Sequence, residues 1–430
     1  MADSLASTSI FSDEEYENLY NHYYPESNYI STVKQCTTGV TASVSPVLTS
    51  ILVHTLIQRI VLTFENVIPR KLIDLFIGLQ GTYLLYENNV NPIAIGICLA
   101  FFIVGFAGIK IFRTWPYLGP WFTVASLAGI CGIQASIDGA LFLSFRGSLM
   151  ILAMKLISLA FDVHQREYES ISIFQAYGYI FNPATYFYGL FTPFKSYEKA
   201  SGFKNVTKVL NSLLLASFCL LLAGACLIYS DCVLGSLLAD NPVFQDFIIS
   251  VRDYLDTDLL ETFEKFVGFI NAQSFRFSNY FVLYFVWATA LIGGFESNKM
   301  ETVNAAKVEF PRSMDEVVRY WNLSLHEFLH TYIYTKTKSI SRPIAIILTF
   351  AASALLHGTN FQIGSVLISL SGFGIAESVF RSKLAHHLNL CIKSRPCKDN
   401  CGHRTGYSIW TTLATKLLNF VFMLINIGTP

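Results

Sequence analysis

A histidine surrounded by apolar residues is the first position in this sequence that could carry chemistry. His357 lies in the segment FAASALLHGTNFQIG, inside an apolar run and not in a polar loop. A neutral imidazole can accept the proton of a hydroxyl group while that group attacks a carbonyl carbon, so His357 is a candidate general base. The alternative is a structural histidine whose neutral ring is hydrogen-bonded between helices, and the sequence leaves both open.

A second candidate region is the segment RYWNLSLHEFLHTYIY, for which we predict a helix over residues 321–334. Its polar residues and their aromatic neighbour are Trp321, Asn322, Ser324, His326 and His330. Such a helix is too polar to face lipid, so we expect its polar side to line a cavity. Asn322 precedes His357 by 35 residues, which leaves room for one turn and one nearly complete membrane span.

The composition indicates that membrane helices position these residues. Of the 430 residues, 53% are apolar and only 14% are charged, whereas about a quarter of the residues in a soluble domain are charged. The formal net charge is zero, which excludes the basic surface of a nucleic-acid-binding protein. The nine cysteines are scattered and several lie in apolar runs, so we expect no disulfide framework.

Apolar runs approach the length that spans a bilayer, about 20 residues. We predict helices at 46–65, 72–86, 91–112, 119–134, 146–161, 173–192, 209–230, 277–295, 341–357, 361–380 and 409–427. Between two of them, residues 231–273 mix charges with apolar residues, which is typical of an amphipathic helix at the membrane surface. The predicted fold is an all-α polytopic membrane helix bundle of about ten to eleven helices, with an internal reaction chamber.

Residues 1–45 are polar and rich in tyrosine, and we predict a tail without regular structure there. Residues 46–427 are predicted to form one transmembrane domain, because neither an internal repeat nor a Gly/Ser-rich linker divides them.

The loop over residues 381–404 carries six basic residues against a single acid. Short loops rich in Lys and Arg face the cytoplasm, so we place this loop on the cytosolic side. Cys391, Cys397, Cys401 and His403 are potential zinc ligands. Their spacing matches no zinc class that we can name, and no metal is expected. A cytosolic cysteine near the membrane could instead be S-acylated.

Several stretches resemble the membrane-bound O-acyltransferase family. A membrane histidine that follows the Asn of a Trp-Asn pair by this interval is the active-site pattern of that family. The similar stretches are FRGSLMILAMKLISLAFD (145–162), SFRFSNYFV (274–282), VEFPRSMDEVVRYWNLS (308–324), AASALLHG (351–358) and RPCKDNCGH (395–403). They follow one another in order over the last two-thirds of the chain, whereas the first 140 residues match only in hydrophobic character. Relatives continue beyond the helix at 409–427, so we expect residues 428–430 to be a shortened end.

The resemblance implies that His357 is the catalytic histidine and Asn322 its partner. An amide can donate a hydrogen bond to the thioester carbonyl or the oxyanion, or orient the imidazole or the hydroxyl, and these roles stay open. We expect direct transfer within a ternary complex, because no GxSxG elbow with triad partners is found.

Four further residues are predicted to contact substrate. Trp321, Ser278 and Asn279 are expected to line the reaction chamber, although the last two could equally join helices through hydrogen bonds. Arg312 is a candidate for binding the phosphates of coenzyme A. Its alternative is an interfacial ion pair with one of the acids that follow it in sequence.

The resemblance is to the branch of the family that attaches a mono-unsaturated fatty acid to a serine of Wnt proteins. It implies an acyltransferase in the endoplasmic reticulum membrane, with palmitoleoyl-CoA as co-substrate, Wnt proteins and membrane lipids as partners, and no resident cofactor. Two alternatives are an acyltransferase that modifies a lipid alcohol or another secreted protein, and a non-enzymatic lipid transporter. A transporter would favour inverted repeats, which the sequence does not show.

Overall fold

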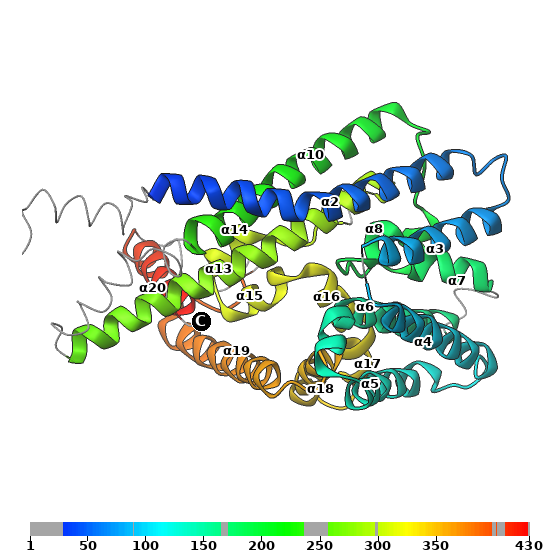
Figure 1. Ribbon diagram of the computed structural model, residues 1–430. Helices are drawn as coiled ribbons and strands as arrows, with labels where there is room; N and C mark the ends of the chain where they lie inside the picture. Colours follow the sequence, from blue (N-terminus) through cyan, green and yellow to red (C-terminus); the bar gives the residue numbers. More distant parts are fainter. Residues whose placement is uncertain are drawn as a thin grey trace, which may run out of the picture. The chain divides into compact units, whose positions relative to one another are not determined.

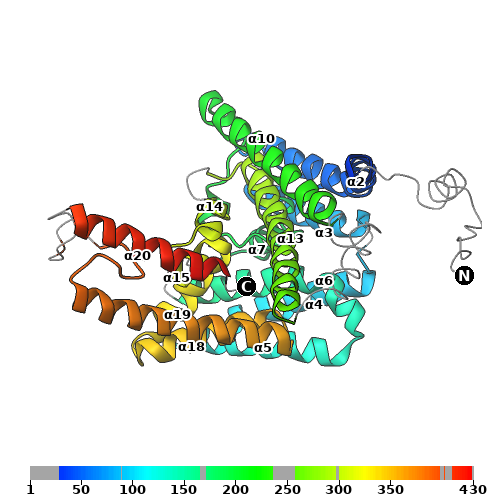
Figure 2. The ribbon, with the colours of Figure 1, turned by 90° about the vertical axis from the view of Figure 1, so that its left-hand side faces the viewer.

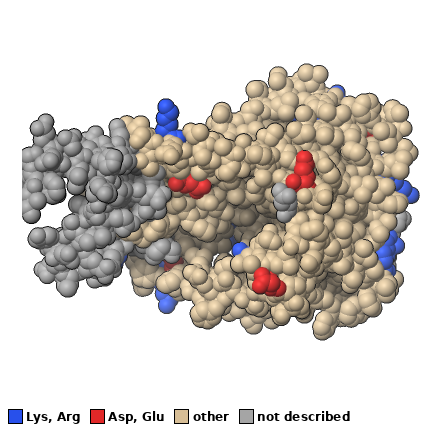
Figure 3. Space-filling model, viewed as in Figure 1, with Lys and Arg blue, Asp and Glu red and all other residues tan. Residues whose placement is uncertain are grey.

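The computed structural model describes residues 29–88, 90–164, 171–235, 257–296, 300–397, 401 and 409–428. The regular structure of these residues is entirely helical (Figure 1). Seven of the described helices are long and apolar enough to cross a membrane, and two shorter apolar helices, Arg342–Leu356 and Ile409–Met423, accompany them. Few charged groups interrupt the face shown in Figure 3, as expected where lipid is the solvent. The predicted all-α membrane bundle is confirmed.

The described helices, with the two π-helices labelled η, follow in chain order. They are α2 (Tyr29–Thr63), α3 (Arg70–Glu87), α4 (Pro92–Ile111), α5 (Leu118–Ser136), α6 (Gly139–His164), α7 (Ile173–Ile180), α8 (Pro183–Tyr186), α9 (Phe194–Glu198), α10 (Val206–Ile228), η1 (Tyr229–Leu234), α13 (Thr257–Ile292), α14 (Ala305–Glu309), α15 (Met314–Trp321), α16 (Leu323–Phe328), η3 (Leu329–Tyr334), α17 (Thr335–Thr337), α18 (Arg342–Leu356), α19 (Phe361–Leu388) and α20 (Ile409–Gly428).

The predicted irregular tail is wrong for residues 29–45, which form the first part of α2. Its polar side chains are compatible with a helix because their hydroxyl groups return to the backbone. Thr37 Oγ1 donates to the Val33 carbonyl at 2.7 Å, and Thr41 Oγ1 donates to the Thr37 carbonyl at 2.6 Å. Residues 1–28 of the predicted tail lie outside the described part of the chain.

The predicted helix at 173–192 is also wrong, because it is divided into α7 and α8. Asn182 and Pro183 make the break: the Asn182 side chain accepts the Ala184 N–H at 3.0 Å, and Pro183 occupies the first position of α8. Neither piece is long enough to cross a membrane.

Two helices extend further than predicted. The described end of the segment 231–273 is the beginning of α13, a continuous helix over Thr257–Ile292, and not a separate surface helix. Residues 381–388 of the predicted basic loop continue α19. In both places the charged residues suggested a boundary, but charged side chains near a helix end can reach polar partners without breaking the backbone ladder.

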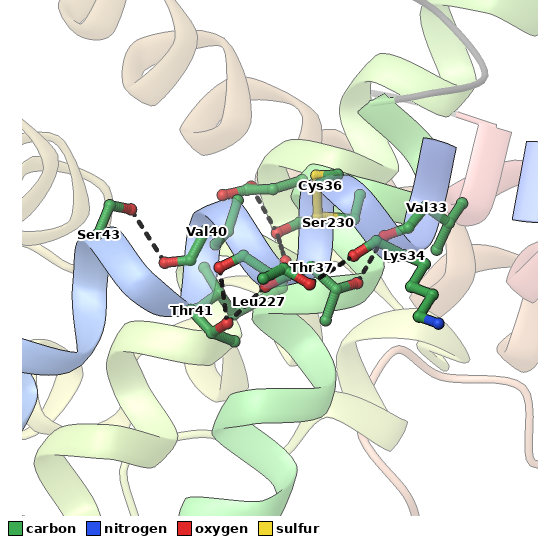
Figure 4. Close-up of a disulfide and its surroundings, with 12 residues drawn as sticks. Val33, Lys34, Cys36, Thr37, Val40, Thr41, Ser43, Leu227 and Ser230 are labelled. Atoms are coloured by element: carbon green, nitrogen blue, oxygen red, sulfur yellow. Dashed lines mark hydrogen bonds between the residues drawn. A yellow bond between two sulfur atoms is a disulfide. The ribbon is translucent and has the colours of Figure 1, made fainter. Parts of the chain in front are cut away.

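Contacts divide the chain into two compact units, and each is described by itself: residues 1–45 with 226–278, and residues 46–225 with 279–430. In the first, a disulfide joins Cys36 of α2 to Cys232 of η1 (Figure 4). The expectation of no disulfide framework did not anticipate this bond, whose two members are separated by 196 residues in sequence. Spacing alone does not reveal such a pairing. The single transmembrane domain over residues 46–427 stays a prediction.

In the second unit α4 and α5 pack against α6, which also contacts α7, α8, α9 and η3 (Figures 1 and 2). Lys155 of α6 is fully buried. Its Nζ donates to the carbonyls of Tyr179 and Ile180 at 2.9 and 3.2 Å and to Thr185 Oγ1 at 2.9 Å. These acceptors lie at the end of α7 and in α8, so one ammonium group fixes the divided segment to α6.

We predict that Lys155→Ala lowers the thermal midpoint of the detergent-purified protein. The substitution leaves two buried carbonyls and a hydroxyl without their donor, at a cost of about 1–3 kcal/mol for each group left unsatisfied. Lys71→Ala, at an exposed position of α3, is the matched control and should leave the midpoint unchanged. Equal midpoints for the two variants would contradict the role given to Lys155.

Candidate functional site

The turn between α18 and α19 holds His357. The helix ends after Leu356, and the His357 N–H still donates to the Ala354 carbonyl at 3.1 Å. Gly358 follows with φ +83°, in the left-handed region where a glycine ends a helix without steric cost. Asn360 then caps α19 by accepting the Ile363 N–H at 3.1 Å. The histidine therefore lies in a short, fully hydrogen-bonded turn and not inside a helix.

Residues of α5 and α6 hold this turn in place. Gln134 Oε1 accepts the Thr359 N–H at 2.6 Å. A Cβ added to Gly358 would lie 2.5 Å from Gln134 Oε1 and 3.0 Å from the Phe142 ring, so the position has room only for glycine. Arg146, also on α6, is close enough for its positive charge to act on His357. The half-buried imidazole thus has a fixed backbone and a cationic neighbour.

Asn322 lies at a second break in the backbone. The predicted continuous helix over 321–334 is wrong, because α15 ends at Trp321, α16 begins at Leu323, and the π-helix η3 follows at Leu329. Asn322 has φ −150° and ψ 92°, and its Oδ1 accepts the Leu325 N–H at 3.0 Å as the N-cap of α16. Since the oxygen is engaged in capping, the Nδ2 amino group is the part of the side chain that can donate to a substrate.

Backbone and side-chain hydrogen bonds fix the break at Asn322. The Leu323 N–H donates to the Thr302 carbonyl at 2.8 Å, and the Asn304 N–H donates to the Tyr320 carbonyl at 3.1 Å. Buried Ser324 donates to the Phe191 carbonyl at 2.9 Å. Ser324 is therefore a structural hydroxyl, not one that lines a cavity.

The helix before His357 packs against a later part of the segment that begins at Asn322. α18, which ends before His357, contacts η3, which continues the chain from α16. No hydrogen bond joins His357 to Asn322 within the described part of the chain. Both side chains are partly exposed and keep a polar nitrogen for a third molecule.

The three residues predicted to line the reaction chamber, Trp321, Ser278 and Asn279, do not share one environment. Trp321 lies beside α13, with its ring centroid 5.9 Å from that of Tyr280. Asn279, one residue before Tyr280, has a buried Nδ2 without a partner among the described residues. Ser278 is exposed and belongs to the first unit. The structure thus brings Trp321 next to the segment that carries Asn279, and a role for all three in substrate binding stays a prediction.

Arg312 holds the backbone that follows α19. Its Nη2 donates to the Cys391 carbonyl at 3.0 Å and its Nε to the Lys393 carbonyl at 3.2 Å. The backbone N–H of Arg312 donates to Glu316 at 2.9 Å. Because two of its side-chain donor groups are already engaged in this structure, coenzyme A binding by Arg312 stays a prediction.

Asp315, near the start of α15, joins the same region. It accepts hydrogen bonds from Nε and Nη2 of Arg395, each at 2.9 Å. Burial raises the pKa of Asp315, but the hydrogen bond and charge of Arg395, together with the charge of Arg319, outweigh it and hold the pKa below its ordinary value. Asp315 is therefore ionised at neutral pH.

A model of the membrane-bound O-acyltransferase family, MBOAT, matches residues 18–370 of the chain. The chain belongs to this family. It is 33% identical over 317 residues to the protein-serine O-palmitoleoyltransferase porcupine of Mus musculus and 32% identical over 315 residues to that of Homo sapiens. Each of these matches covers 68% of this chain and 64% of the relative. The porcupine protein of Caenorhabditis briggsae is 28% identical over 307 residues, which cover 70% of this chain and 63% of that protein.

The chain thus spans somewhat less than two-thirds of the length of these MBOAT relatives. His357 and Asn322 both lie within the residues that the family model matches, whereas the cysteines after α19 lie beyond them.

Sequence reasoning missed two residues that shape this MBOAT chain. Gln134 gave no signal, because a glutamine near the end of an apolar helix is common and its partner lies 225 residues away. Arg381 was interpreted as a loop cation, yet its side chain is fully buried and donates to the carbonyls of Ile392 and Arg312 at 2.7 and 2.6 Å. Arg381 follows a long apolar stretch within α19, and this position could have indicated burial. A buried arginine must donate to acceptors such as these carbonyls.

We predict that Gly358→Ala destabilises the protein and impairs the His357 turn. An L-residue in the left-handed region costs about 1–2 kcal/mol before any clash with Gln134 is counted. Gly364→Ala in α19 is the matched control, because an added methyl group there meets nothing within 4 Å. Thermal midpoints in detergent should fall for the first variant and stay or rise for the second, and the opposite order would refute this account of the turn.

Proposed function

We propose that the chain is an acyl-CoA-dependent protein-serine O-acyltransferase that transfers a palmitoleoyl-type chain to a serine of a secreted Wnt protein. Membership of the MBOAT family and the protein-serine O-palmitoleoyltransferase activity named for the porcupine relatives support the reaction class. The assignment of His357 as the base rests on the structure of its turn. The imidazole is half-buried, and Gln134 holds the backbone of the turn by a hydrogen bond to Thr359.

The proposed reaction moves one proton and exchanges one bond. His357 accepts the proton of the serine hydroxyl while the serine oxygen attacks the carbonyl carbon of the acyl thioester. Asn322 Nδ2 donates to the carbonyl oxygen as negative charge develops on it. The carbon–sulfur bond then breaks, the ester remains on the serine, and the protonated imidazole returns its proton to the departing coenzyme A sulfur. Acyl-CoA is a co-substrate, and the proposal includes no resident cofactor.

We place the reaction in the endoplasmic reticulum membrane. Coenzyme A is charged and cytosolic, and the positive-inside rule assigns the basic residues after α19 to that side. A serine of a secreted protein is available only in the lumen. The Cys36–Cys232 disulfide supports exposure of part of the chain to that oxidising compartment. The proposed site therefore lets the acyl chain change sides without transport of coenzyme A.

The test of this function is an assay of the purified full chain with labelled palmitoleoyl-CoA and three acceptors. These are a Wnt-derived serine peptide, the same peptide with alanine in place of the serine, and a long-chain lipid alcohol. The proposal requires transfer to the serine peptide alone. Transfer to the lipid alcohol in preference to the peptide would assign the chain to a different acceptor class.

In this assay His357→Ala should lower the turnover number by about 10²–10⁴-fold, the usual effect of removing a general base. His387→Ala, at an exposed position near the end of α19, is the matched control and should retain full turnover. Thermal midpoints of both variants should match the wild type. Wild-type turnover by a folded His357→Ala protein would remove His357 from the mechanism.

Two substitutions of Asn322 separate its capping oxygen from its donor group. Asn322→Asp keeps an oxygen that can cap α16 but loses the Nδ2 donor, whereas Asn322→Ala loses both. We expect the aspartate variant to keep its thermal midpoint and lose turnover with little change in the Michaelis constant for acyl-CoA. The alanine variant should lose both stability and turnover. A raised Michaelis constant with unchanged turnover in Asn322→Asp would make this residue a binding group.

A further inference from the structure

Three cysteines that are spread over the segment after α19 meet in space. The Sγ atoms of Cys391, Cys397 and Cys401 all lie within 4.8 Å of one another, and those of Cys391 and Cys401 are 3.1 Å apart. All three residues are partly buried. The cluster belongs to the second unit and lies beyond residues 18–370, the range that the family model matches. The mechanism proposed above makes no use of it.

The spacing of the sulfur atoms suits a metal ion. In a tetrahedral zinc site with Zn–S bonds of about 2.3 Å, neighbouring sulfur atoms lie about 3.8 Å apart. The Cys391–Cys401 separation of 3.1 Å is somewhat shorter than this value, and all three sulfur atoms lie within 4.8 Å of one another, the range from which a single ion could be reached. A disulfide between Cys391 and Cys401 fits less well, because it requires sulfur atoms about 2.05 Å apart and would leave the third cysteine without a role.

The backbone that presents the first cysteine is held by side chains from elsewhere in the fold. The Cys391 carbonyl accepts from Arg312 Nη2 at 3.0 Å and from Asn419 Nδ2 at 3.4 Å. The next residue, Ile392, is fully buried, and its carbonyl accepts from Arg381 Nε at 2.7 Å. Hydrogen bonds that fix a ligand's backbone reduce the cost of ordering a metal site.

Residues near the second cysteine are fixed in the same way. Arg395, two residues before Cys397, makes its paired hydrogen bonds to Asp315 of α15. On either side of the first cysteine, Leu390 and Ile392 pack with Ala385 of α19 in a small apolar cluster. The thiols of Cys391 and Cys397 therefore project from backbone that is anchored to α15 and α19.

We propose that Cys391, Cys397 and Cys401 bind one Zn²⁺ ion through three thiolates. Each thiol that becomes a ligand releases its proton to solvent as the Zn–S bond forms, so up to three protons leave and no electrons are transferred. The fourth tetrahedral position is left for a water molecule or a further side chain. His403, the remaining potential ligand of the sequence, lies outside the described residues.

Zinc at this position would be structural. The ion would cross-link Cys391, Cys397 and Cys401. It would thereby stabilise the backbone to which Arg312 and Arg381 donate hydrogen bonds. Through Arg395 and Asp315 the same segment is joined to α15, the helix that ends directly before Asn322. The proposal does not depend on the proposed acyltransfer, because metal content is measured without any substrate.

The test is the zinc content of the purified full chain after desalting into metal-free detergent buffer. We expect about one equivalent of zinc per chain in the wild type, as in a site that holds one ion. The triple variant Cys391→Ser/Cys397→Ser/Cys401→Ser should lose it, and Cys131→Ser, a partly buried thiol of α5, should retain it. A wild type without zinc, or a triple variant that keeps as much zinc as Cys131→Ser, would overturn the proposal.

A second measurement needs no variant and covers the case in which the triple variant does not fold. The wild type is stripped with a chelator and titrated with Co²⁺, whose thiolate complexes show charge-transfer absorption in the near ultraviolet and tetrahedral bands in the visible. These bands should appear, saturate at about one equivalent and disappear when Zn²⁺ is added, because zinc binds such sites more tightly than cobalt does. Absence of the bands contradicts the site. So does an intact mass that shows a fatty acyl group on any of the three cysteines.

Discussion

A buried ammonium group is the constraint on which much of the second unit depends. Lys155 lies at the centre of α6 without contact with solvent, where an unpaired cation would cost many kilocalories per mole. Its partners are the last carbonyls of α7 and a hydroxyl of α8. The helix break at Asn182 is therefore required by the lysine, since a continuous helix would use those carbonyls internally. The same α6 carries Phe142 and Arg146 to the turn that holds His357.

Both candidate catalytic residues stand where helices stop. A break in apolar surroundings is stable only when freed backbone groups find partners, and at both breaks hydrogen bonds supply such partners. The turn after α18 uses a left-handed glycine and the side chain of Gln134. The break before α16 uses the Asn322 side chain itself. At a helix end the side chains leave the regular helical arrangement. An imidazole and an amide placed there can therefore present a nitrogen to substrate even in a largely apolar protein.

Hydrophobic pattern predicted most of the long apolar helices, because lipid demands such helices wherever the chain crosses it, but it did not reveal the break that divides residues 173–192. The runs at 91–112 and 119–134 became α4 and α5 with ends that differ by one or two residues. The candidate histidine and asparagine could be selected by residue type and by family resemblance. The contacts that hold the structure around them could not be predicted in this way. Gln134 bonds to a residue 225 positions away, and the Cys36–Cys232 disulfide joins residues 196 positions apart. Such pairs are decided by tertiary packing, which local pattern does not contain.

The disulfide of α2 and η1 has a consequence for how this chain can come apart. It closes a covalent ring that begins at Cys36 and ends at Cys232, nearly half of the molecule. A single peptide-bond cleavage inside this ring opens it but releases nothing, because the two pieces remain joined through the sulfur atoms. A protein nicked there would keep the mass of the intact chain, apart from one added water molecule, until a reductant reached the bond. Persistence of the chain under proteolysis is thus governed, over this range, by the redox state of its surroundings.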